Sequence, residues 1–251
     1  MKSKKISVII PCYNGGKFIR QNVEKISDYL ANNFLDYEII IVNDGSFDNT
    51  REEIFQVEKN LPKIILIDNE INSGKGHAVK GGILKSRYET VMFLDADLAI
   101  PIESLENFIE ALDDGFDIAI ASRFVPGLKV TKPVLWHRQF MEKIFRLLRM
   151  VITNNYSIQD TQCGFKVFSR EVAMKIFPLM TIDRFAFDAE VIFVAVKSGY
   201  WIKELPIILQ NPTESSIRIY RDSLNMLLDL IRIRINYFSG KYTGKISIDK
   251  D

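Results

Sequence analysis

Two aspartates flank an alanine in Asp95-Ala96-Asp97, directly after the apolar run of residues 91–94. At the end of a strand, carboxylates at positions i and i+2 can turn toward one cation, and their oxygens are ligands that Mg²⁺ and Mn²⁺ prefer. The spacing therefore predicts a divalent-metal site at Asp95 and Asp97, with a diphosphate completing the shell. A second interpretation stays open, in which Asp97 begins a turn and caps the helix announced by Pro101.

Polar loops follow two other apolar runs. Asp44, in the AsnAspGlySer segment 43–46, is placed to accept a hydrogen bond from a nucleobase imide or a ribose hydroxyl, although these residue types also suit a plain turn. Residues 72–76 (AsnSerGlyLysGly) precede a helical stretch, so backbone N–H groups and the Lys75 ammonium are suited to hold phosphate. The GxxxxGK(S/T) pattern of a Walker loop is absent, so the segment indicates phosphate binding without matching that motif.

The elements that must position these residues follow from the apolar pattern. Short apolar runs bounded by turn residues predict buried strands at residues 6–10, 38–42, 64–67, 91–94 and 118–121. Between them, apolar residues recur at helical spacing within residues 18–30, 54–57, 79–84 and 105–112. This alternation predicts an α/β protein with a mainly parallel central sheet flanked by helices, in which ligands bind beyond the carboxyl ends of the strands.

The second half of the chain is less regular from about residue 122. Four basic residues are interleaved with apolar ones in a pattern suited to an anionic membrane surface: Arg138, Lys143, Arg146 and Arg149. The last helical stretch, residues 220–238, carries two apolar stripes: Leu224, Leu227, Leu228, Ile231, Ile235 and Phe238 form one, and Met226, Leu230, Ile233 and Tyr237 the other. The alternative is that both helices pack on the core with a solvated basic face. An apolar stripe meant for lipid also looks like one meant for a second copy of the chain, so a homo-oligomer stays open.

Composition limits the classes of protein. A chain of 251 residues can bury one large α/β core, and 33 Lys and Arg against 32 Asp and Glu create no net field for nucleic acid. Cys12 and Cys163 lie far apart without a CxxC spacing, which indicates a reducing compartment. The first apolar run is too short for a signal peptide, and no window holds 18 uninterrupted apolar residues. We therefore expect a cytoplasmic protein that meets a membrane, if at all, only peripherally.

Six segments carry a resemblance to a known family: residues 7–14 (SerValIleIleProCysTyrAsn), 41–46 (IleValAsnAspGlySer), 72–79 (AsnSerGlyLysGlyHisAlaVal), 93–99 (PheLeuAspAlaAspLeuAla), 121–124 (AlaSerArgPhe) and 160–166 (AspThrGlnCysGlyPheLys). In this order they resemble the motifs of family 2 glycosyltransferases, in the branch of dolichyl-phosphate glucosyltransferases and dolichyl-phosphate mannose synthases. The resemblance runs from Ile6 to about Tyr242 and implies a GT-A fold. It also implies a glycosyltransferase domain over residues 1–215, with a donor half (1–121) and an acceptor half (122–215), and a C-terminal amphipathic helix and tail over 216–251.

The resemblance assigns roles to particular residues. It implies a donor site formed by Pro11, Tyr13, Asn14, Asp44, Gly45, Ser46, Gly74, Lys75, Asp95, Ala96 and Asp97. Arg123 is expected near the phosphates, and an acceptor site at Arg138, Gln162 and Arg218. Residues 184–190 (ArgPheAlaPheAspAlaGlu) resemble a further motif of the branch, which brings Asp188 or Glu190 to the acceptor; the alternative is a helix start whose acidic residues favour the dipole.

Three departures from the family pattern affect these assignments. Gly15 stands where the first motif usually has Glu, which weakens one donor contact near the base or ribose. Ala99 stands where mannose synthases commonly have Gln, and this favours the glucosyltransferase-like branch. The family often has a tryptophan after the late proline, and this chain has Gln210, Asn211 and Pro212 there instead, which alters the expected acceptor pocket.

The predicted function is an inverting transfer of a hexose from a nucleotide-diphosphate sugar, UDP-glucose before GDP-mannose, to a polyprenyl phosphate (dolichyl or undecaprenyl) at a membrane surface. If the acceptor is instead a saccharide hydroxyl, a carboxylate base is needed, and Asp188 is the candidate. Two other classes stay open. A sugar-phosphate nucleotidyltransferase would carry a Gly-rich, Arg-containing phosphate loop directly after the first strand, whereas in this chain no Arg precedes Arg20. The presence of both Asp95 and Asp97 disfavours the other class, a non-catalytic nucleotide-sugar-binding protein.

Overall fold

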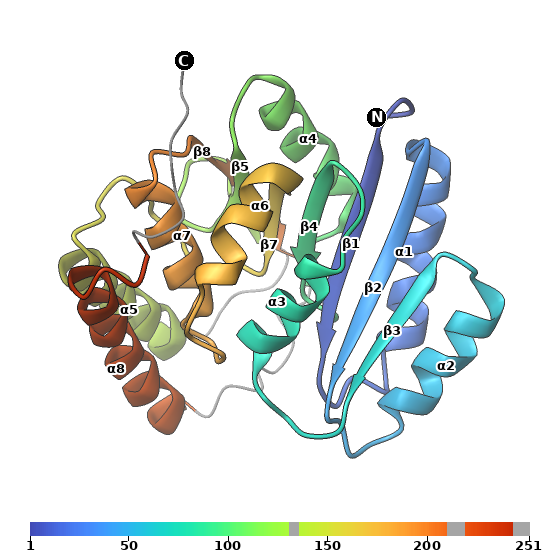
Figure 1. Cartoon of the computed structure of the whole chain (residues 1–251), viewed down its shortest axis with the longest axis horizontal. Coiled ribbons are helices and arrows are strands. Elements are labelled where there is room, and N and C mark those ends of the chain that lie inside the picture. The colour runs from blue at the N-terminus through green and yellow to red at the C-terminus, as the bar shows by residue number, and fades with distance from the viewer. Residues whose placement is uncertain (131–135, 210–218, 243–251) are drawn as a thin grey trace.

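A computed structural model describes residues 1–130, 136–209 and 219–242. Its centre is a seven-stranded sheet in the order β3-β2-β1-β4-β7-β5-β8 (Figure 1). The strands are β1 (Lys5–Cys12), β2 (Asp36–Asp44), β3 (Ile64–Asn69), β4 (Thr90–Leu94), β5 (Ile118–Ser122), β7 (Phe165–Ser169) and β8 (Ile202–Pro206). A small parallel pair, β6 (Lys129–Val130) and β9 (Ile208–Leu209), lies apart from it.

All neighbouring strands of the large sheet run parallel except at β7, which is antiparallel to both β4 and β5. The five strands expected from the apolar runs are β1 to β5, and the mainly parallel sheet is confirmed. The apolar pattern did not reveal β7 or β8, which complete the sheet beyond β4 and beside β5.

Helices cover both faces of the sheet. On one face α1 (Ile19–Asn33), α2 (Thr50–Asn60) and α4 (Leu105–Asp113) share a core with the alternate strand residues Val8, Ile10, Ile39 and Ile41. On the other face α3 (Lys75–Leu84), α6 (Arg170–Ile176) and α7 (Phe187–Lys197) pack on Ile9, Ile40, Phe93 and Phe168. Short 3₁₀ turns, η1 (Ile102–Ser104) and η2 (Phe177–Leu179), complete these layers.

Two long helices lie side by side at one end of the molecule, α5 (Trp136–Thr153) and α8 (Ile219–Phe238) (Figure 1). In α8, Leu230 and Ile233 are fully buried in the core that α7 shares. The other apolar stripe of α8 is exposed at Leu224, Leu228, Ile231, Ile235 and Phe238, and α5 adds exposed Ile144, Leu147, Leu148 and Val151. We call these nine residues the apolar face.

The expected basic side of α5 needs one correction. Arg149 is only 2% exposed, and its guanidinium donates to the carbonyl oxygens of Asn155 (2.8 Å) and Ile158 (2.7 Å). Buried polar groups must find hydrogen-bond partners, and these carbonyls supply them. Arg149 therefore holds the loop after α5, while Lys143 stays exposed and Arg146 half-buried.

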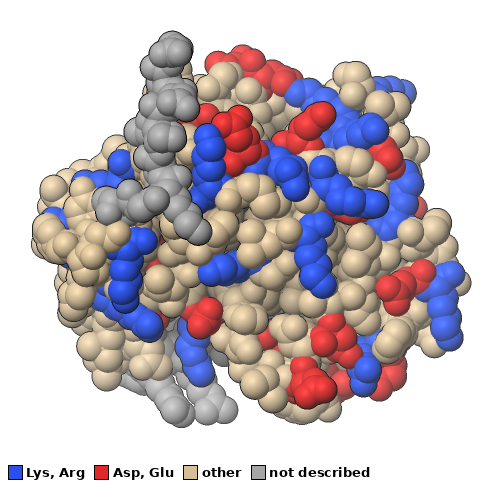
Figure 2. Space-filling model, in the orientation of Figure 1, with Lys and Arg blue, Asp and Glu red and all other residues tan. Residues whose placement is uncertain are grey.

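Charged residues of both signs are interspersed over the face of the molecule in Figure 2, as the near-equal totals lead one to expect. Among the described residues, no helix combines the length and the apolar character needed to cross a bilayer.

Candidate functional site

The loops singled out in the sequence meet at one edge of the sheet, because β1, β2 and β4 are parallel neighbours and end there (Figure 1). Pro11 is the second to last residue of β1 at this edge, paired with Val42 of β2. The structure thus brings together the loops that follow Cys12, Asp44 and Leu94.

The loops after β1 and β2 are tied to each other by Asn14. Its backbone has φ +53°, an uncommon left-handed conformation for a residue other than glycine. Its N–H donates to Ser46 Oγ (2.9 Å), and its side-chain Oδ1 accepts from the N–H of Phe47 (3.0 Å). The rings of Tyr13 and Phe47 meet edge to face, 6.1 Å between centroids, and both are exposed. Two solvent-facing aromatic rings therefore stand where the sequence predicts the donor.

Gly15 and Gly45 are both required by close approaches. A Cβ on Gly15 would lie 2.6 Å from Cys12 Sγ, so this loop has no room for the Glu of the usual motif without rearrangement. Gly45 has φ +67°, and a Cβ there would lie 2.4 Å from the carbonyl carbon of Ile71.

Asp44 shapes the loop that precedes α3. Its carboxylate accepts the N–H groups of Ser73 (3.0 Å) and Gly74 (2.8 Å), and its carbonyl accepts from Asn72 Nδ2 (3.2 Å). The side chain is almost fully buried. A contact between Asp44 and the sugar donor stays a prediction. The structure adds a second role, in which Asp44 holds residues 72–76, which we call the glycine loop, against β2.

Lys75 begins α3 and reaches across to the metal motif. Its Nζ lies 2.6 Å from Asp95 Oδ1 and 5.8 Å from the centre of the Phe187 ring. Burial works to lower the pKa of Lys75, but the carboxylates of Asp95 and Asp188 outweigh it and hold that pKa above its ordinary value. A permanently charged ammonium therefore faces the carboxylate predicted to bind metal.

Asp95 and Asp97 lie in the loop after β4. The Asp95 N–H donates to Gly164 O (3.0 Å), and the Asp95 side chain is 41% exposed. Asp97 Oδ1 accepts the N–H of Ala99 (3.0 Å), so it shapes a short turn within this loop, and Pro101 is the residue at the N-cap of η1. Between them, Ala96 O accepts from Asn22 Nδ2 (2.8 Å). Leu98 has φ +50°, and such uncommon backbone conformations cluster at functional sites.

The carboxylates of Asp95 and Asp97 suit a metal ion that a bound phosphate ligand also coordinates. No group of three or more His, Cys, Asp or Glu side chains gathers into a metal-binding cluster within the described ranges. Mg²⁺ is commonly held by one or two carboxylates together with phosphate oxygens of the substrate. Asp95 and Asp97 provide that pair of carboxylates, and a diphosphate would supply the rest.

Beneath this loop lies a buried ion pair that the sequence did not predict. Lys166 of β7 is fully buried, and its ammonium contacts the Asp188 carboxylate and donates to Cys163 O (2.6 Å). Burial raises the pKa of Asp188, while the neighbouring ammonium groups of Lys166 and Lys75 oppose that rise. Lys75, Asp95, Lys166 and Asp188 thus form a cluster of alternating charge, which we call the charge cluster.

Glu190, the alternative to Asp188, is completely buried two residues further along α7, on a different side of the helix. Its carboxylate accepts hydrogen bonds from Thr181, Ile182 and Tyr242. The two acidic residues of the motif are therefore separated by environment: Asp188 belongs to the charge cluster, and Glu190 holds loops of the second half.

Arg123 is held by two carboxylates. Its guanidinium makes a two-pronged contact with Asp160 (Nε to Oδ2 2.7 Å, Nη2 to Oδ1 3.1 Å) and a third bond to Glu142 (3.0 Å). Burial works to lower the pKa of Arg123, but the Asp160 carboxylate outweighs burial and holds that pKa above its ordinary value. In this arrangement Arg123 positions the loop that begins at Asp160, and a phosphate contact stays a prediction.

The structure describes only part of the expected acceptor site. The Gln162 side chain is mostly buried, and its Nε2 has no hydrogen-bond partner among the residues that the structure describes. Buried donors without a partner are rare and call for an explanation such as a missing ligand or water. Arg218 lies outside the described residues, and for Arg138 the structure describes the α5 backbone but not the side chain.

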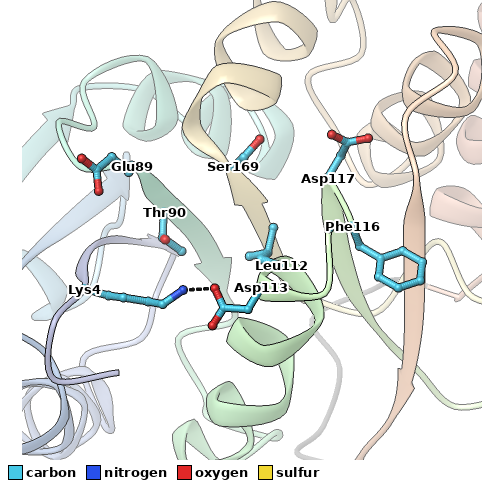
Figure 3. Close-up of a pocket in the computed structure, with 9 residues that line it drawn as sticks. Lys4, Glu89, Thr90, Leu112, Asp113, Phe116, Asp117 and Ser169 are labelled. Atoms are coloured by element: carbon cyan, nitrogen blue, oxygen red, sulfur yellow. Dashed lines mark hydrogen bonds and ion pairs between the residues drawn. The ribbon is translucent and has the colours of Figure 1, made fainter. Parts of the chain in front are cut away.

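A hollow lies at the opposite edge of the sheet. It has a volume of about 390 Å³ and is lined by residues where β4 begins and β7 ends, including Thr90 and Ser169, with the Lys4–Asp113 ion pair beside them (Figure 3). None of the predicted site residues lines it. We expect the chemistry at the edge that carries Asp95, because open α/β sheets bind ligands beyond the carboxyl ends of their strands.

Four residues at the site were not singled out in the sequence: Phe47, Asp160, Gly164 and Lys166. Three of them lie in the 160–166 segment, from which only Gln162 was selected. The available signal was a lysine within the apolar run of β7, PheLysValPheSer, where a charge is unexpected if both faces of the strand are covered.

The fold is of the GT-A type. Solved structures of similar fold include glucosyl-3-phosphoglycerate synthase from Mycobacterium tuberculosis in complex with Mn²⁺, UDP and glucosyl-3-phosphoglycerate, with a TM-score of 0.64 at 15% identity over 95% of this chain and 80% of that one. Staphylococcus aureus TarS (residues 1–349) matches with a TM-score of 0.57 at 19% identity, over 98% and 75% of the two chains.

The particular family follows from the sequence comparisons. The model of glycosyl transferase family 2 matches residues 7–177, and the chain belongs to this family. Among curated relatives, a dolichyl-phosphate beta-glucosyltransferase of Trichomonas vaginalis is 33% identical over 96% of this chain and 74% of its own length. The enzymes of that name from Saccharomyces cerevisiae (32%; 94% and 76%) and Homo sapiens (30%; 96% and 78%) are similar to a comparable extent.

Proposed function

We propose that the chain transfers glucose from UDP-glucose to a polyprenyl phosphate of the dolichyl type, with inversion, at the cytoplasmic surface of a membrane. The observation that carries the proposal is the similarity to dolichyl-phosphate beta-glucosyltransferases over nearly the whole chain, combined with two carboxylates and a lysine gathered at the carboxyl edge of the sheet. The fold neighbour crystallised with Mn²⁺ and UDP supports the nature of the donor.

The side chains of Lys75, Asp95 and Asp97 suit the demands of the reaction. In glycosyl transfer the departing diphosphate gathers negative charge while the anomeric carbon becomes electron-poor. Asp95 and Asp97 would hold Mg²⁺ or Mn²⁺, which when bound supplies Lewis-acid neutralisation of the diphosphate. Lys75, whose ammonium lies 2.6 Å from Asp95, is placed to add fixed positive charge to the same group.

The environment of Asp188 favours a phosphate acceptor over a hydroxyl. A general base must reach the proton that it removes, whereas Asp188 is almost fully buried and paired with Lys166. A phosphate monoester has a second pKa of about 6 and is largely ionised at neutral pH, so it needs no base to become a nucleophile. This supports the lipid phosphate as acceptor, and cations rather than Asp188 as its partners.

The apolar face of α5 and α8 supports contact with a membrane. Monomeric soluble proteins rarely expose large contiguous apolar patches, and such patches mark sites of interaction. The exposed Lys143 and Arg232 lie on the same two helices and suit anionic lipid headgroups.

The test of the reaction uses radiolabelled UDP-glucose, Mn²⁺ and either a polyprenyl phosphate or an oligosaccharide. We expect label in the organic phase with the lipid and none in the saccharide. Label in the saccharide alone would replace the lipid by a hydroxyl acceptor, pyrophosphate-dependent nucleotide exchange would indicate a nucleotidyltransferase, and donor binding without turnover would indicate a binding protein.

The test of the membrane surface uses vesicles that contain anionic lipid. The double variant Leu228→Glu with Ile235→Glu should lose vesicle binding, whereas Leu35→Glu should keep it, because Leu35 is similarly exposed but lies between α1 and β2. If the double variant converts a dimer into a monomer and leaves vesicle binding unchanged, the apolar face is an interface between copies of the chain.

A further inference from the structure

Glu190 is a buried carboxylate that the proposed reaction does not use. It is 0% exposed, and hydrogen bonds converge on it from the Thr181 N–H (3.0 Å) and Oγ1 (2.7 Å), the Ile182 N–H (2.9 Å) and the Tyr242 hydroxyl (2.6 Å). Asn236 of α8 extends this network by donating to Thr181 Oγ1 (2.8 Å). No cation pairs with Glu190 among the described residues. A buried carboxylate is costly unless hydrogen bonds satisfy it, and here four donors do so.

The backbone that Glu190 holds is pressed against the glycine loop of the donor site. Asp183 O accepts the N–H of His77 in the first turn of α3 (3.0 Å). A Cβ on Gly74 would lie 2.4 Å from Asp183 O, and one on Gly76 would lie 2.6 Å from Ile182 O. Residues 181–183, which we call the wall, therefore form the surface against which the loop around Lys75 packs.

Lys75 stands between these two glycines, so the position of the wall decides where its ammonium lies. On the far side the loop is fixed by Asp44, whose carboxylate binds the N–H groups of Ser73 and Gly74. Two buried carboxylates thus fix the loop: Asp44 of β2 binds it directly, and Glu190 of α7 acts through the backbone of residues 181–183. A displacement of the wall would move Lys75 relative to Asp95, at present 2.6 Å away.

We propose that Glu190, together with Thr181 and Tyr242, is a positioning device for the donor loop: it fixes the wall at residues 181–183 and thereby the ammonium of Lys75. This inference rests on the proposed function in one respect, since it takes the Lys75 loop as the seat of the donor diphosphate. It assigns Glu190 to donor binding from a distance, through the wall, and removes it from the acceptor site.

The test uses variants that change the network by single hydroxyl groups. Thr181→Val removes the hydroxyl that donates to Glu190 and keeps the side-chain shape and the N–H, while Thr181→Ser keeps the hydroxyl. Tyr242→Phe removes the other hydroxyl. Tyr237→Phe is the matched control, because it removes a hydroxyl from a tyrosine of α8 whose ring packs on Phe193.

We expect Thr181→Val and Tyr242→Phe to raise the dissociation constant for UDP with Mn²⁺, and KM for UDP-glucose, by about tenfold, the loss of roughly one hydrogen bond to a charged group. KM for the polyprenyl phosphate should stay at the wild-type value, and Thr181→Ser and Tyr237→Phe should bind UDP as the wild type does. Hydrogen exchange at the His77 amide should accelerate in the two affected variants, because that N–H reports the contact with Asp183 directly.

Two results separate the possible failures. If Thr181→Val and Tyr242→Phe lower the melting temperature but leave UDP affinity and His77 exchange unchanged, Glu190 only stabilises the fold and the inference is overturned. If wild-type protein binds no UDP while His77 exchange still accelerates in both variants, the mechanical link stands and the proposed donor is wrong.

Discussion

Gly164 offers a sharp test of the metal loop, because its missing side chain leaves room for Asp95. A Cβ on Gly164 would lie 2.0 Å from Asp95 Oδ2, 2.3 Å from Cγ and 2.5 Å from Oδ1, whereas real Cβ contacts stay above 3.0 Å. In Gly164→Ala the carboxylate must therefore move by about 1 Å, and misplacement of a catalytic group by this amount costs roughly 10²-fold in rate, or about 2.7 kcal/mol of activation free energy.

The control is Gly81→Ala, in the interior of α3, where a Cβ would meet no atom within 4 Å. This change should leave the rate unaltered and stabilise the fold by about 0.5–1 kcal/mol, since alanine is the better helix former. The assay is Mn²⁺-dependent transfer of glucose from UDP-glucose to polyprenyl phosphate, with thermal unfolding followed in parallel. A folded Gly164→Ala protein with the wild-type rate would refute the placement of Asp95 at the reacting group.

Three further predictions concern the charges and thiols around the site. Asp97→Asn should remove turnover and the Mn²⁺-dependent part of donor binding, measured by electron paramagnetic resonance of Mn²⁺; unchanged titrations would exclude Asp97 as a ligand. Lys166→Met should destabilise the fold by about 3–5 kcal/mol in urea, because it leaves Asp188 buried without its cation, and adding Asp188→Asn should recover part of the loss; equal stability of the single and double variants would contradict the pairing. Burial raises the pKa of the Cys12 and Cys163 thiols to about 12 each, so at pH 8 both should resist iodoacetamide in the native protein and react once it is unfolded, as mass spectrometry can check.

The fold of residues 1–121 was predictable from sequence because its signals are local. Each apolar run from β1 to β5 is followed at once by the polar loop that it presents, so the position of Asp44, Lys75 or Asp95 follows from the alternation alone. The contacts of these side chains were not predictable, because they depend on partners distant in sequence. Lys75 meets Asp95 twenty residues later, and Asp44 binds the N–H groups of Ser73 and Gly74.

The chain after residue 121 was less predictable because its key polar residues are buried. Arg149 fits the basic pattern of α5 by spacing, yet its guanidinium turns inward to backbone carbonyls. Lys166 lies on the same face of β7 as the buried Phe168, and only the position of Asp188 in α7 explains how its charge is accommodated there. The choice between Asp188 and Glu190 likewise required the partners of each carboxylate, which no spacing rule supplies.

The most direct measurement is the anomalous diffraction of Mn²⁺ in crystals grown with UDP-glucose. The account predicts a single manganese peak bound by oxygens of Asp95 and Asp97 and of the diphosphate, with the Lys75 ammonium beside the same phosphates. A manganese ion and diphosphate bound elsewhere, with both aspartates turned away from them, would contradict it.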